Sequence, residues 1–369
     1  MNRKIRIGVV GGGVYGAQML KCFASQQAKG RIELAGLADL SPEVLARQHA
    51  AFGVEGYGDY IEMMDRAGLD AVAVATPDHL HGAVISAAAE RGLHVLSQKP
   101  LDVDPVRAAE LIARCEAAGV LLYVDFHKRF DPAHIRLRND IAAGAFGRLQ
   151  YGSVHMEDRI TVPTVWLKDW AARSSPSWFL GVHFYDLVYW LTGQQPVRVL
   201  ASGHKGKLES LGLAGAWDSI QARVEYETGF TMNYDLSWIL PESFPSIVNQ
   251  GIRLVGEDGV AEIDSQDRGY FAAYACDAGS QLANPYGALE YEHPLLGARA
   301  EGYTFDSMSY FIDVLSALRN GVRHDQLADT YPDGNSALVS TRIGAAVDRS
   351  IAGGGIEMID LVDLGSGLR

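Results

Sequence analysis

The feature that most constrains the fold is a regular alternation of strand-like and helix-like segments over about the first 125 residues. Continuous apolar runs at 4–10, 31–39 and 70–77 alternate with helical patterns, two of which, at 41–53 and 104–119, begin at Ser-Pro or Asp-Pro and end at glycine. Apolar runs of this kind are typical of strands buried on both faces of a parallel sheet. The alternation therefore predicts a doubly wound α/β domain over residues 1–128.

The pattern changes after residue 128, where short strand-like runs follow one another with turn signals such as Glu-Thr-Gly and Glu-Asp-Gly between them. These runs predict a second, α+β domain over residues 129–369 with a large, mostly antiparallel and open-faced sheet. Helical patterns are expected near 131–143, 181–193, 305–320 and 335–352. An uncovered sheet face is a natural oligomer interface, so we expect a homodimer or homotetramer.

Composition narrows the class of protein. The chain is 48% hydrophobic and 21% charged, which indicates a soluble globular protein, and no apolar run approaches the ~18 residues of a membrane span. A net charge of −13 argues against a nucleic-acid partner. Cys22, Cys115 and Cys276 are far apart and fit neither a zinc site nor a disulfide framework. We expect a cytoplasmic protein without a bound metal.

The stretch after the first apolar run, VVGGGVYG, carries a Gly-x-Gly-x-x-Gly motif at Gly11, Gly13 and Gly16. The first glycine permits a tight turn, the second lets a pyrophosphate approach the backbone, and the third allows close packing of helix on strand. The amides of the following helix N-terminus suit an anion, and Val14 and Tyr15 are expected beside it. At this position the motif predicts a dinucleotide site.

A carboxylate that could accept the ribose hydroxyls ends the second predicted strand. Asp39 lies 28 residues after Gly11, against about 20 in the usual fingerprint, and the polar connection before residue 32 accounts for the extra length. A carboxylate there repels a 2′-phosphate, which favours NAD over NADP. The alternative is a helix-capping aspartate, although Ser41 already suits that role.

Further motifs give the chain a family resemblance. It resembles the glucose–fructose oxidoreductase / inositol dehydrogenase / rhizopine-catabolism (Gfo/Idh/MocA) family in the glycine-rich turn, in the residues at 76–100, and in KRFDP, GVHFYD and DGNSALVSTRIGAAVDRS farther on. The 76–100 stretch contributes Thr76-Pro77, His81 four residues past the proline, and Lys99-Pro100. The resemblance implies that Thr76, Pro77, His81 and Gln98 line the cofactor site.

The resemblance also implies the catalytic residues. In the family the lysine of Lys-Pro closes the nicotinamide site and points at the substrate hydroxyl, a role that falls here on Lys99. This agrees with the rule that open α/β sheets bind ligands at the carboxyl ends of their strands; a solvated loop lysine is the alternative. His183 in GVHFYD corresponds to the family's general acid/base, with Asp186 on the same helix face, and a buried core histidine is the alternative.

Two departures from the family pattern affect this site. The family usually has Glu-Lys-Pro, where this chain has Gln98, and often has an aspartate four residues before the histidine, where this chain has Phe179. His127 stands at a position that is often polar in the family, and we expect it to line the substrate pocket. Among many aromatic residues between 166 and 190, Trp166 is a further pocket candidate.

The sequence thus predicts an NAD(P)-dependent oxidoreductase that transfers hydride between nicotinamide and a secondary hydroxyl of a sugar, polyol or derivative. Two alternatives stay open at this point. The fold also hosts glycosidases that use NAD transiently, and at least one dinucleotide-binding sensor without turnover.

Overall fold

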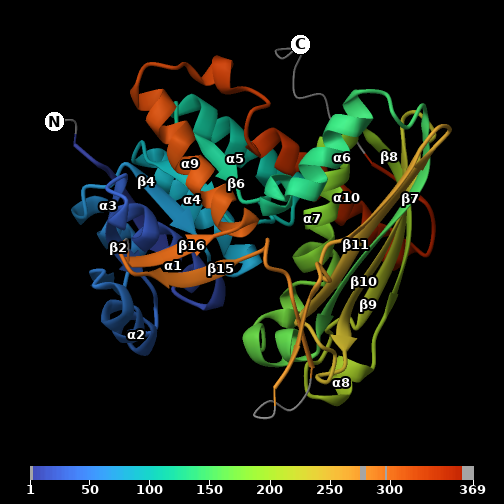
Figure 1. The fold of residues 1–369 in the computed structure, drawn as a ribbon, viewed down its shortest axis with the longest axis horizontal. Coiled ribbons are helices and arrows are strands. Elements are labelled where there is room, and N and C mark those ends of the chain that lie inside the picture. The colour runs from blue at the N-terminus through green and yellow to red at the C-terminus, as the bar shows by residue number, and fades with distance from the viewer. Residues whose placement is uncertain (1–2, 275–279, 296, 360–369) are drawn as a thin grey trace. The chain divides into compact units, whose positions relative to one another are not determined.

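The computed structural model describes residues 3–274, 280–295 and 297–359 (Figure 1). Cys276 lies outside the described residues. The chain forms two compact units, one of Met1–Ile135 with Asn284–Leu338 and the other of Arg136–Ala283 with Val339–Arg369. The domain division at residue 128 stays a prediction. Residues 284–338 belong to the same compact unit as the N-terminal part of the chain.

The first unit contains the predicted doubly wound sheet. Its six strands are all parallel and lie in the order β3-β2-β1-β4-β5-β6, which confirms the α/β fold class. The strands are β1 (Ile5–Val10), β2 (Ile32–Ala38), β3 (Gly56–Tyr57), β4 (Ala71–Val74), β5 (His94–Ser97) and β6 (Leu122–Val124). The helices between them are α1 (Val14–Ala28), α2 (Pro42–Phe52), α3 (Tyr60–Arg66), α4 (His81–Glu90) and α5 (Pro105–Ala117).

Local sequence signals explain where these helices begin and end. The Ser41 hydroxyl accepts a hydrogen bond from Val44 N at the start of α2, and Pro42 occupies its first turn. That helix ends at Gly53, whose backbone is left-handed and whose N–H donates to His49 O at 2.8 Å. Asp104 caps α5 in the same way that Ser41 caps α2, because its carboxylate accepts from Val106 N. The Ser-Pro and Asp-Pro signals were therefore sound guides to the helix starts.

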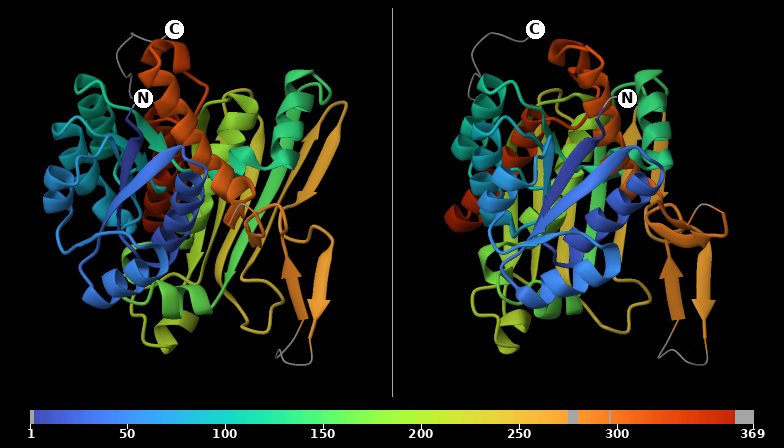
Figure 2. Two further views of the ribbon diagram at one scale, coloured as in Figure 1. Left: turned by 60° about the vertical axis from the view of Figure 1, so that its left-hand side comes forward. Right: turned by 90° about the vertical axis from the view of Figure 1, so that its left-hand side faces the viewer.

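A helix from late in the chain completes the hydrophobic core of this unit. This helix is α9 (Tyr303–Arg319), drawn in orange in Figures 1 and 2. Its residues Phe305, Met308 and Phe311 are fully buried in one cluster with side chains of β1 and β2. The ring of Phe311 meets Tyr123 edge-on, with centroids 5.6 Å apart. A two-stranded sheet of β15 (Leu289–His293) and β16 (Gly297–Glu301) precedes α9. Helix α9 was predicted, but its burial against the first sheet was not.

The second unit is built on a seven-stranded sheet in the order β12-β11-β7-β10-β9-β8-β17. Only the β7–β10 pair is parallel among its described pairs, so the predicted mostly antiparallel sheet is confirmed. The strands are β7 (Leu149–Arg159), β8 (Pro196–His204), β9 (Ser219–Tyr226), β10 (Thr231–Leu240), β11 (Val248–Gly256), β12 (Val260–Asp264) and β17 (Glu357–Met358). A separate hairpin pairs β13 (Tyr270–Ala273) with β14 (Ser280–Ala283).

The two faces of this sheet differ in burial. Ile220, Val224 and Leu236 are buried on one face, whereas side chains at alternate positions, such as Ser153 and Asp235, are exposed. Helices cover the buried face: the Ser350 hydroxyl, for example, accepts from Ala201 N of β8 at 2.9 Å. The α-helices not yet named are α6 (Pro132–Ala142), α7 (Val182–Thr192), α8 (Lys207–Ser210) and α10 (Gly334–Gly353). Assembly through the exposed face stays a prediction.

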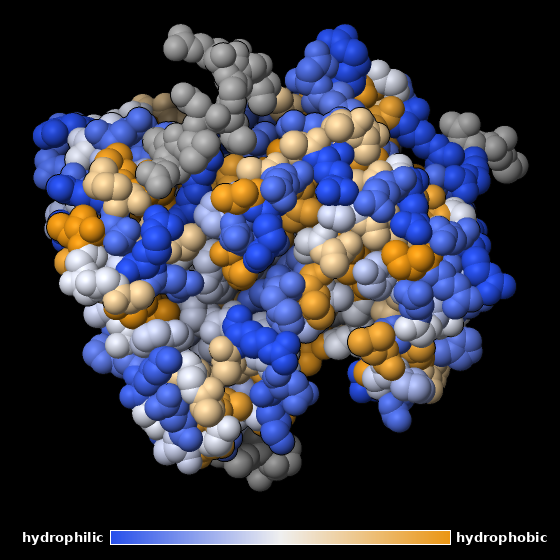
Figure 3. All heavy atoms as spheres, turned by 180° about the vertical axis from the view of Figure 1, so that it is seen from behind, coloured by the Kyte–Doolittle hydropathy of each residue, from blue (hydrophilic) through white to orange (hydrophobic). Residues whose placement is uncertain are grey.

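Hydrophilic and hydrophobic side chains are interspersed over the face shown in Figure 3. None of the helices in the described parts of the chain combines the length and the apolar composition needed to cross a membrane.

The burial of α9 gives a first prediction. Replacing Phe311 by Ala should lower the free energy of unfolding by about 3–5 kcal/mol, because a fully buried aromatic side chain is lost from a packed core. Arg319→Ala on the exposed side of the same helix is the matched control and should change stability by less than about 0.5 kcal/mol. Equal effects of the two changes in chemical denaturation would contradict the burial of α9.

Candidate active site

The glycine-rich turn has the geometry that the motif predicts. Gly11 has φ of +93°, and its N–H donates to Ala38 O at 2.8 Å, which joins the turn to the end of β2. A Cβ on Gly16 would lie 1.9 Å from Gly11 O, so no larger residue can pack here without moving the backbone. The turn therefore brings the start of α1 directly against the end of β1.

The space over the helix N-terminus fits a pyrophosphate. Gly13 is exposed and precedes α1 without a side-chain cap, and a Cβ built on it would meet no described atom within 4 Å. The first amides of an α-helix have no partner within the helix, and they carry partial positive charge. The residues at 13–16 thus present unblocked donors where an anion of a dinucleotide would bind.

Asp39 lies beside this turn at the end of β2. One carboxylate oxygen accepts from Gly12 N at 2.7 Å and the other from Ser41 N at 2.8 Å. Gln48 of α2 supports the same turn, because its side-chain amide donates to Gly12 O at 2.9 Å. Asp39 is partly exposed, and each carboxylate oxygen can accept a further hydrogen bond. Its proposed contact with a ribose stays a prediction.

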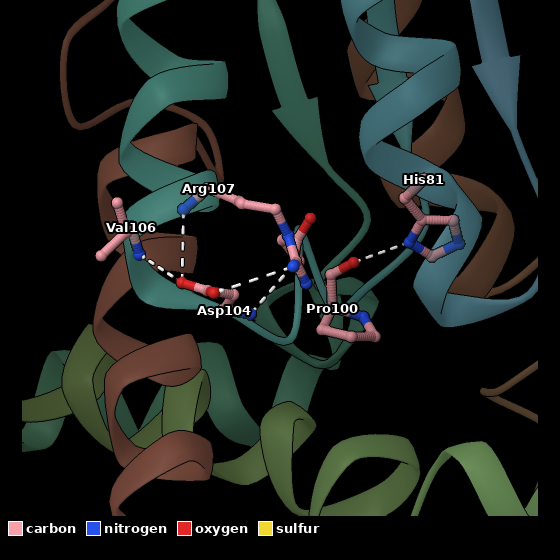
Figure 4. Close-up of polar contacts among 6 residues, drawn as sticks. His81, Pro100, Asp104, Val106 and Arg107 are labelled. Carbon is pink, nitrogen blue, oxygen red and sulfur yellow. Dashed lines mark hydrogen bonds and ion pairs between the residues drawn. The ribbon is translucent and has the colours of Figure 1, made fainter.

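Lys99 lies two residues after the end of strand β5, and it is joined to Pro100 by a cis peptide. It is only 6% exposed, which excludes the alternative of a solvated loop lysine. His81, itself 1% exposed, lies with one ring nitrogen 2.7 Å from Pro100 O (Figure 4) and the other 2.8 Å from Thr76 O. His81 therefore links the segments that follow β4 and β5, and its expected contact with a cofactor stays a prediction.

The chain beyond Pro100 is also held firmly. The Asp102 carboxylate accepts from the Arg107 guanidinium and from Asp104 N. The Asp104 carboxylate in turn accepts from the first amides of α5, those of Val106 and Arg107 (Figure 4). These contacts fix the loop between Lys99 and α5 at its far end. The position of Lys99 is thereby set on both sides, by β5 before it and by this corner after it.

A buried carboxylate at the end of β6 connects the parts of this site. Asp125 is fully buried, and one of its oxygens accepts from Tyr15 OH at 2.7 Å and from Gln98 Nε2 at 2.6 Å. Its other oxygen accepts from Ser307 Oγ at 2.6 Å. Burial together with the Asp125 charge raises the pKa of Tyr15 well above its ordinary value, so that hydroxyl keeps its proton and donates it.

His127 lies next to the same cluster. Its ring stacks on Tyr303 with centroids 5.8 Å apart, and its Nδ1 is 3.5 Å from Tyr15 OH. Burial, followed by the positive charges of Lys128 and Lys99, holds the pKa of the His127 imidazole well below its ordinary value of 6.5. The imidazole is therefore neutral near pH 7. The structure brings Tyr15, Gln98 and His127 together around Asp125, and contact of His127 with a substrate stays a prediction.

The remaining predicted residues belong to the second unit. His183, 6% exposed, and the fully buried Asp186 lie one turn apart on α7. Phe179, in the short helical segment η5 (Ser177–Gly181) just before it, meets Trp170 and Trp238 edge-on, with ring centroids 6.1 and 6.0 Å away. Trp166 is 42% exposed. Phe179 thus belongs to an aromatic cluster, and the substrate roles of Trp166, Phe179 and His183 stay predictions.

Sequence reasoning missed Asp125 and its partner Ser307. A carboxylate that ends the apolar run LLYVD is a detectable signal, because a buried charge needs partners. Ser307 carries no such signal, since it comes from α9, 182 residues away in the chain. Within the described residues, no group of three His, Cys, Asp or Glu side chains is arranged to hold a metal ion.

Comparison with known protein families agrees with this geometry. Residues 5–126 match the model of the Gfo/Idh/MocA oxidoreductase family with its NAD-binding Rossmann fold, and residues 134–262 match the Gfo/Idh/MocA C-terminal domain. Together the two matches cover more than half of the chain. The chain belongs to the Gfo/Idh/MocA family.

Individual relatives are more distant. Inositol 2-dehydrogenase 1 from Saccharopolyspora erythraea is 29% identical over 234 residues, which are 63% of this chain and 67% of that protein. The alignments with this protein and three further curated relatives span 57–67% of the length of each relative. These alignments are consistent with an oxidoreductase, and they leave the substrate to be proposed.

Solved structures extend the likeness to nearly the whole fold. Scyllo-inositol dehydrogenase from Lactobacillus casei, with bound NAD(H) and scyllo-inositol, has a TM-score of 0.75 at 18% identity and covers 97% of this chain and 99% of that chain. The WlbA dehydrogenase from Bordetella pertussis, in complex with NADH and UDP-GlcNAcA, has a TM-score of 0.74 at 22% identity and covers 97% and 100%. At these identities the likeness shows the fold alone.

The glycine-rich turn gives a matched pair of variants. Gly13→Ala adds a methyl group into open space, so its thermal midpoint should stay near wild type while NADH binding weakens at least about tenfold. Gly16→Ala forces a clash with Gly11 O and should lower the thermal midpoint by several degrees. NADH binding is measured by fluorescence titration, and unchanged affinity in Gly13→Ala would contradict binding of the pyrophosphate at this turn.

The lowered pKa of His127 predicts a pH dependence of stability. Between pH 7 and pH 5 the unfolded chain takes up a proton at the ordinary imidazole pKa, whereas folded His127 does not. The free energy of unfolding should therefore decrease as the pH is lowered through this window, and the decrease should be smaller in His127→Gln by about 2 kcal/mol. Denaturation curves of the two proteins at pH 7, 6 and 5 test this; parallel losses would contradict a neutral buried His127.

Proposed function

We propose that this protein is an NAD-dependent dehydrogenase that oxidises a secondary hydroxyl on the ring of a cyclic polyol, a sugar or a sugar derivative. Two features at the carboxyl edge of one parallel sheet carry the proposal. The N-terminus of α1 has no side-chain cap and borders open space at Gly13, and Lys99 is buried. The first feature suits a dinucleotide, and the second suits a polar group that reacts beside it.

The cofactor preference follows from Asp39. A carboxylate beside the glycine-rich turn accepts hydrogen bonds from two ribose hydroxyls and repels the 2′-phosphate of NADP. Its bonds to Gly12 N and Ser41 N support the preference, because they hold the carboxylate at the edge of the turn. Bound NAD would supply the hydride acceptor, and the protein has to supply orientation and proton transfer.

We assign the proton of the substrate hydroxyl to His183 and the orientation of that hydroxyl to Lys99. An imidazole titrates near neutral pH, which suits the uptake of a proton as hydride leaves the same carbon. The ammonium group of Lys99 would donate a hydrogen bond to the substrate oxygen and stabilise negative charge that develops there. The family resemblance of the GVHFYD and Lys-Pro motifs supports both roles.

The names of related proteins suggest where to look for the substrate. Relatives named as inositol dehydrogenases and a fold neighbour bound to a nucleotide sugar acid suggest a hydroxylated ring. Phe179, where the family often has an aspartate, removes one acceptor near His183. We therefore expect a ring with fewer hydroxyl groups or with an apolar substituent to be preferred over inositol itself.

The test is NADH formation by the purified protein with NAD and a panel of inositols, aldoses, sugar acids, anhydrosugars and glycosides. Lys99→Met keeps a side chain of similar length but removes the charge. It should reduce kcat at least about 100-fold and leave the affinity for NADH within about threefold of wild type. Lys29→Met, at an exposed position of the same unit, is the control and should retain full activity.

Other outcomes identify other functions. Cleavage of a glycoside without accumulation of NADH would indicate a glycosidase that uses NAD transiently. NADH binding without turnover on any compound would favour a dinucleotide sensor. Wild-type activity of Lys99→Met would refute the role assigned to that lysine.

A further inference from the structure

The network around Asp125 contains polar groups from three separate elements of the first unit. Tyr15 comes from the first turn of α1, directly after the glycine-rich turn; Gln98 comes from the end of β5, directly before Lys99; and Ser307 comes from α9. Asp125 itself is held in place by its backbone, since its N–H donates to Ser97 O at 2.8 Å. One carboxylate therefore joins the expected pyrophosphate end of the site to the Lys-Pro loop.

The contacts indicate that this carboxylate is ionised. The Gln98 amide can only donate through its nitrogen, and the hydroxyls of Tyr15 and Ser307 complete three donors to two oxygens. Tyr123 adds a second layer, because its OH donates to Ser307 O at 2.9 Å. Burial raises the pKa of the Asp125 carboxyl above its ordinary value, and the hydrogen bonds from Ser307, Tyr15 and Gln98 and the charge of Lys99 offset this rise only in part.

The identity of residue 98 is linked to that of residue 125. With Gln at 98, the 2.6 Å contact between the two side chains is an amide–carboxylate hydrogen bond. The glutamate of the usual Glu-Lys-Pro motif would instead place two carboxylates against each other in a buried site, which is strongly unfavourable. Asp125, whose charge interacts with that of Lys99, therefore contributes a carboxylate at this end of the sheet, where the usual motif contributes one from residue 98.

We propose that Asp125 is a positioning residue for Lys99, and that it replaces the carboxylate of the Glu-Lys-Pro motif by acting through Gln98 and through its own negative charge. Its hydrogen bond to Gln98 fixes the backbone that leads into Lys99. Its charge favours the ammonium form of Lys99 in a buried setting, where an isolated cation would be costly. Its hydrogen bond from Tyr15 holds the segment that carries Lys99 at a fixed position relative to the glycine-rich turn.

Exchanging the two groups tests the proposal. Asp125→Asn removes the charge at nearly constant shape, Gln98→Glu introduces a second carboxylate, and the double variant Gln98→Glu/Asp125→Asn reverses the amide–carboxylate pair. We expect kcat to fall at least about tenfold in each single variant with the KM for NAD within about threefold, because a misplaced lysine affects the reaction more than cofactor binding. The double variant should recover to within about fivefold of wild type.

A second readout does not depend on turnover. The rate at which acetic anhydride modifies Lys99, measured by peptide mass spectrometry relative to the exposed Lys29, reports how much of the amine is unprotonated. We expect this rate to rise severalfold in Asp125→Asn and to return toward wild type in the double variant. If Asp125 has only a structural role, its replacement should lower the thermal midpoint. The double variant Gln98→Glu/Asp125→Asn should then recover neither kcat nor the modification rate of Lys99.

The proposal rests on the proposed dehydrogenase function, and the two readouts separate their failures. If the wild-type protein turns over none of the panel, the function fails while the modification rates still decide the role of Asp125. Wild-type kcat and modification rate in folded Asp125→Asn would overturn the proposal. If Asp125→Asn does not fold, the double variant Gln98→Glu/Asp125→Asn decides. A folded double variant that lacks activity, and whose Lys99 reacts with acetic anhydride at a rate unlike wild type, would also overturn the proposal.

Discussion

The arrangement of the first unit depends on one buried carboxylate, that of Asp125, at the end of strand β6 in its six-stranded sheet. Asp125 accepts hydrogen bonds from Tyr15, Gln98 and Ser307, and these partners belong to the first helix, to the loop before Lys99 and to α9. A buried charge is tolerated only when its partners are all in place, so any of these elements that moved would leave an unsatisfied ion. The polar cluster thus specifies one arrangement of elements that apolar packing alone would hold less strictly.

The same constraint relates structure to chemistry. The glycine-rich turn offers an open helix N-terminus to an anion, and the segment after β5 offers a buried lysine to a second group. Because Asp125 bonds to the residues next to both features, the distance between them is fixed before any ligand binds. Preorganisation of this kind reduces the cost of orienting cofactor and substrate, and it is what a hydride transfer between them requires.

Much of this architecture could be predicted from the sequence, and the reasons are local. The alternation of apolar runs with capped helices predicts the parallel sheet, and the position of Gly16 predicts the close approach of α1 to β1. Elements with weak local signals were missed: β3 has two residues, and α3 has seven. The burial of α9 in the first core and the Asp125–Ser307 bond both join residues far apart in the chain, and single-sequence patterns carry no information on such pairs.

The proposed transfer of hydride from a ring carbon of the substrate to NAD can be measured most directly with an isotope label. The protein would be incubated with NAD and cyclic polyols or sugars deuterated at their ring carbons, and the recovered nicotinamide analysed by mass spectrometry and NMR. A dehydrogenase predicts one deuterium on the nicotinamide ring for each molecule of ketone formed, with none derived from solvent. Recovery of undeuterated NAD together with unchanged substrates, from a protein that binds NADH, would contradict the claim.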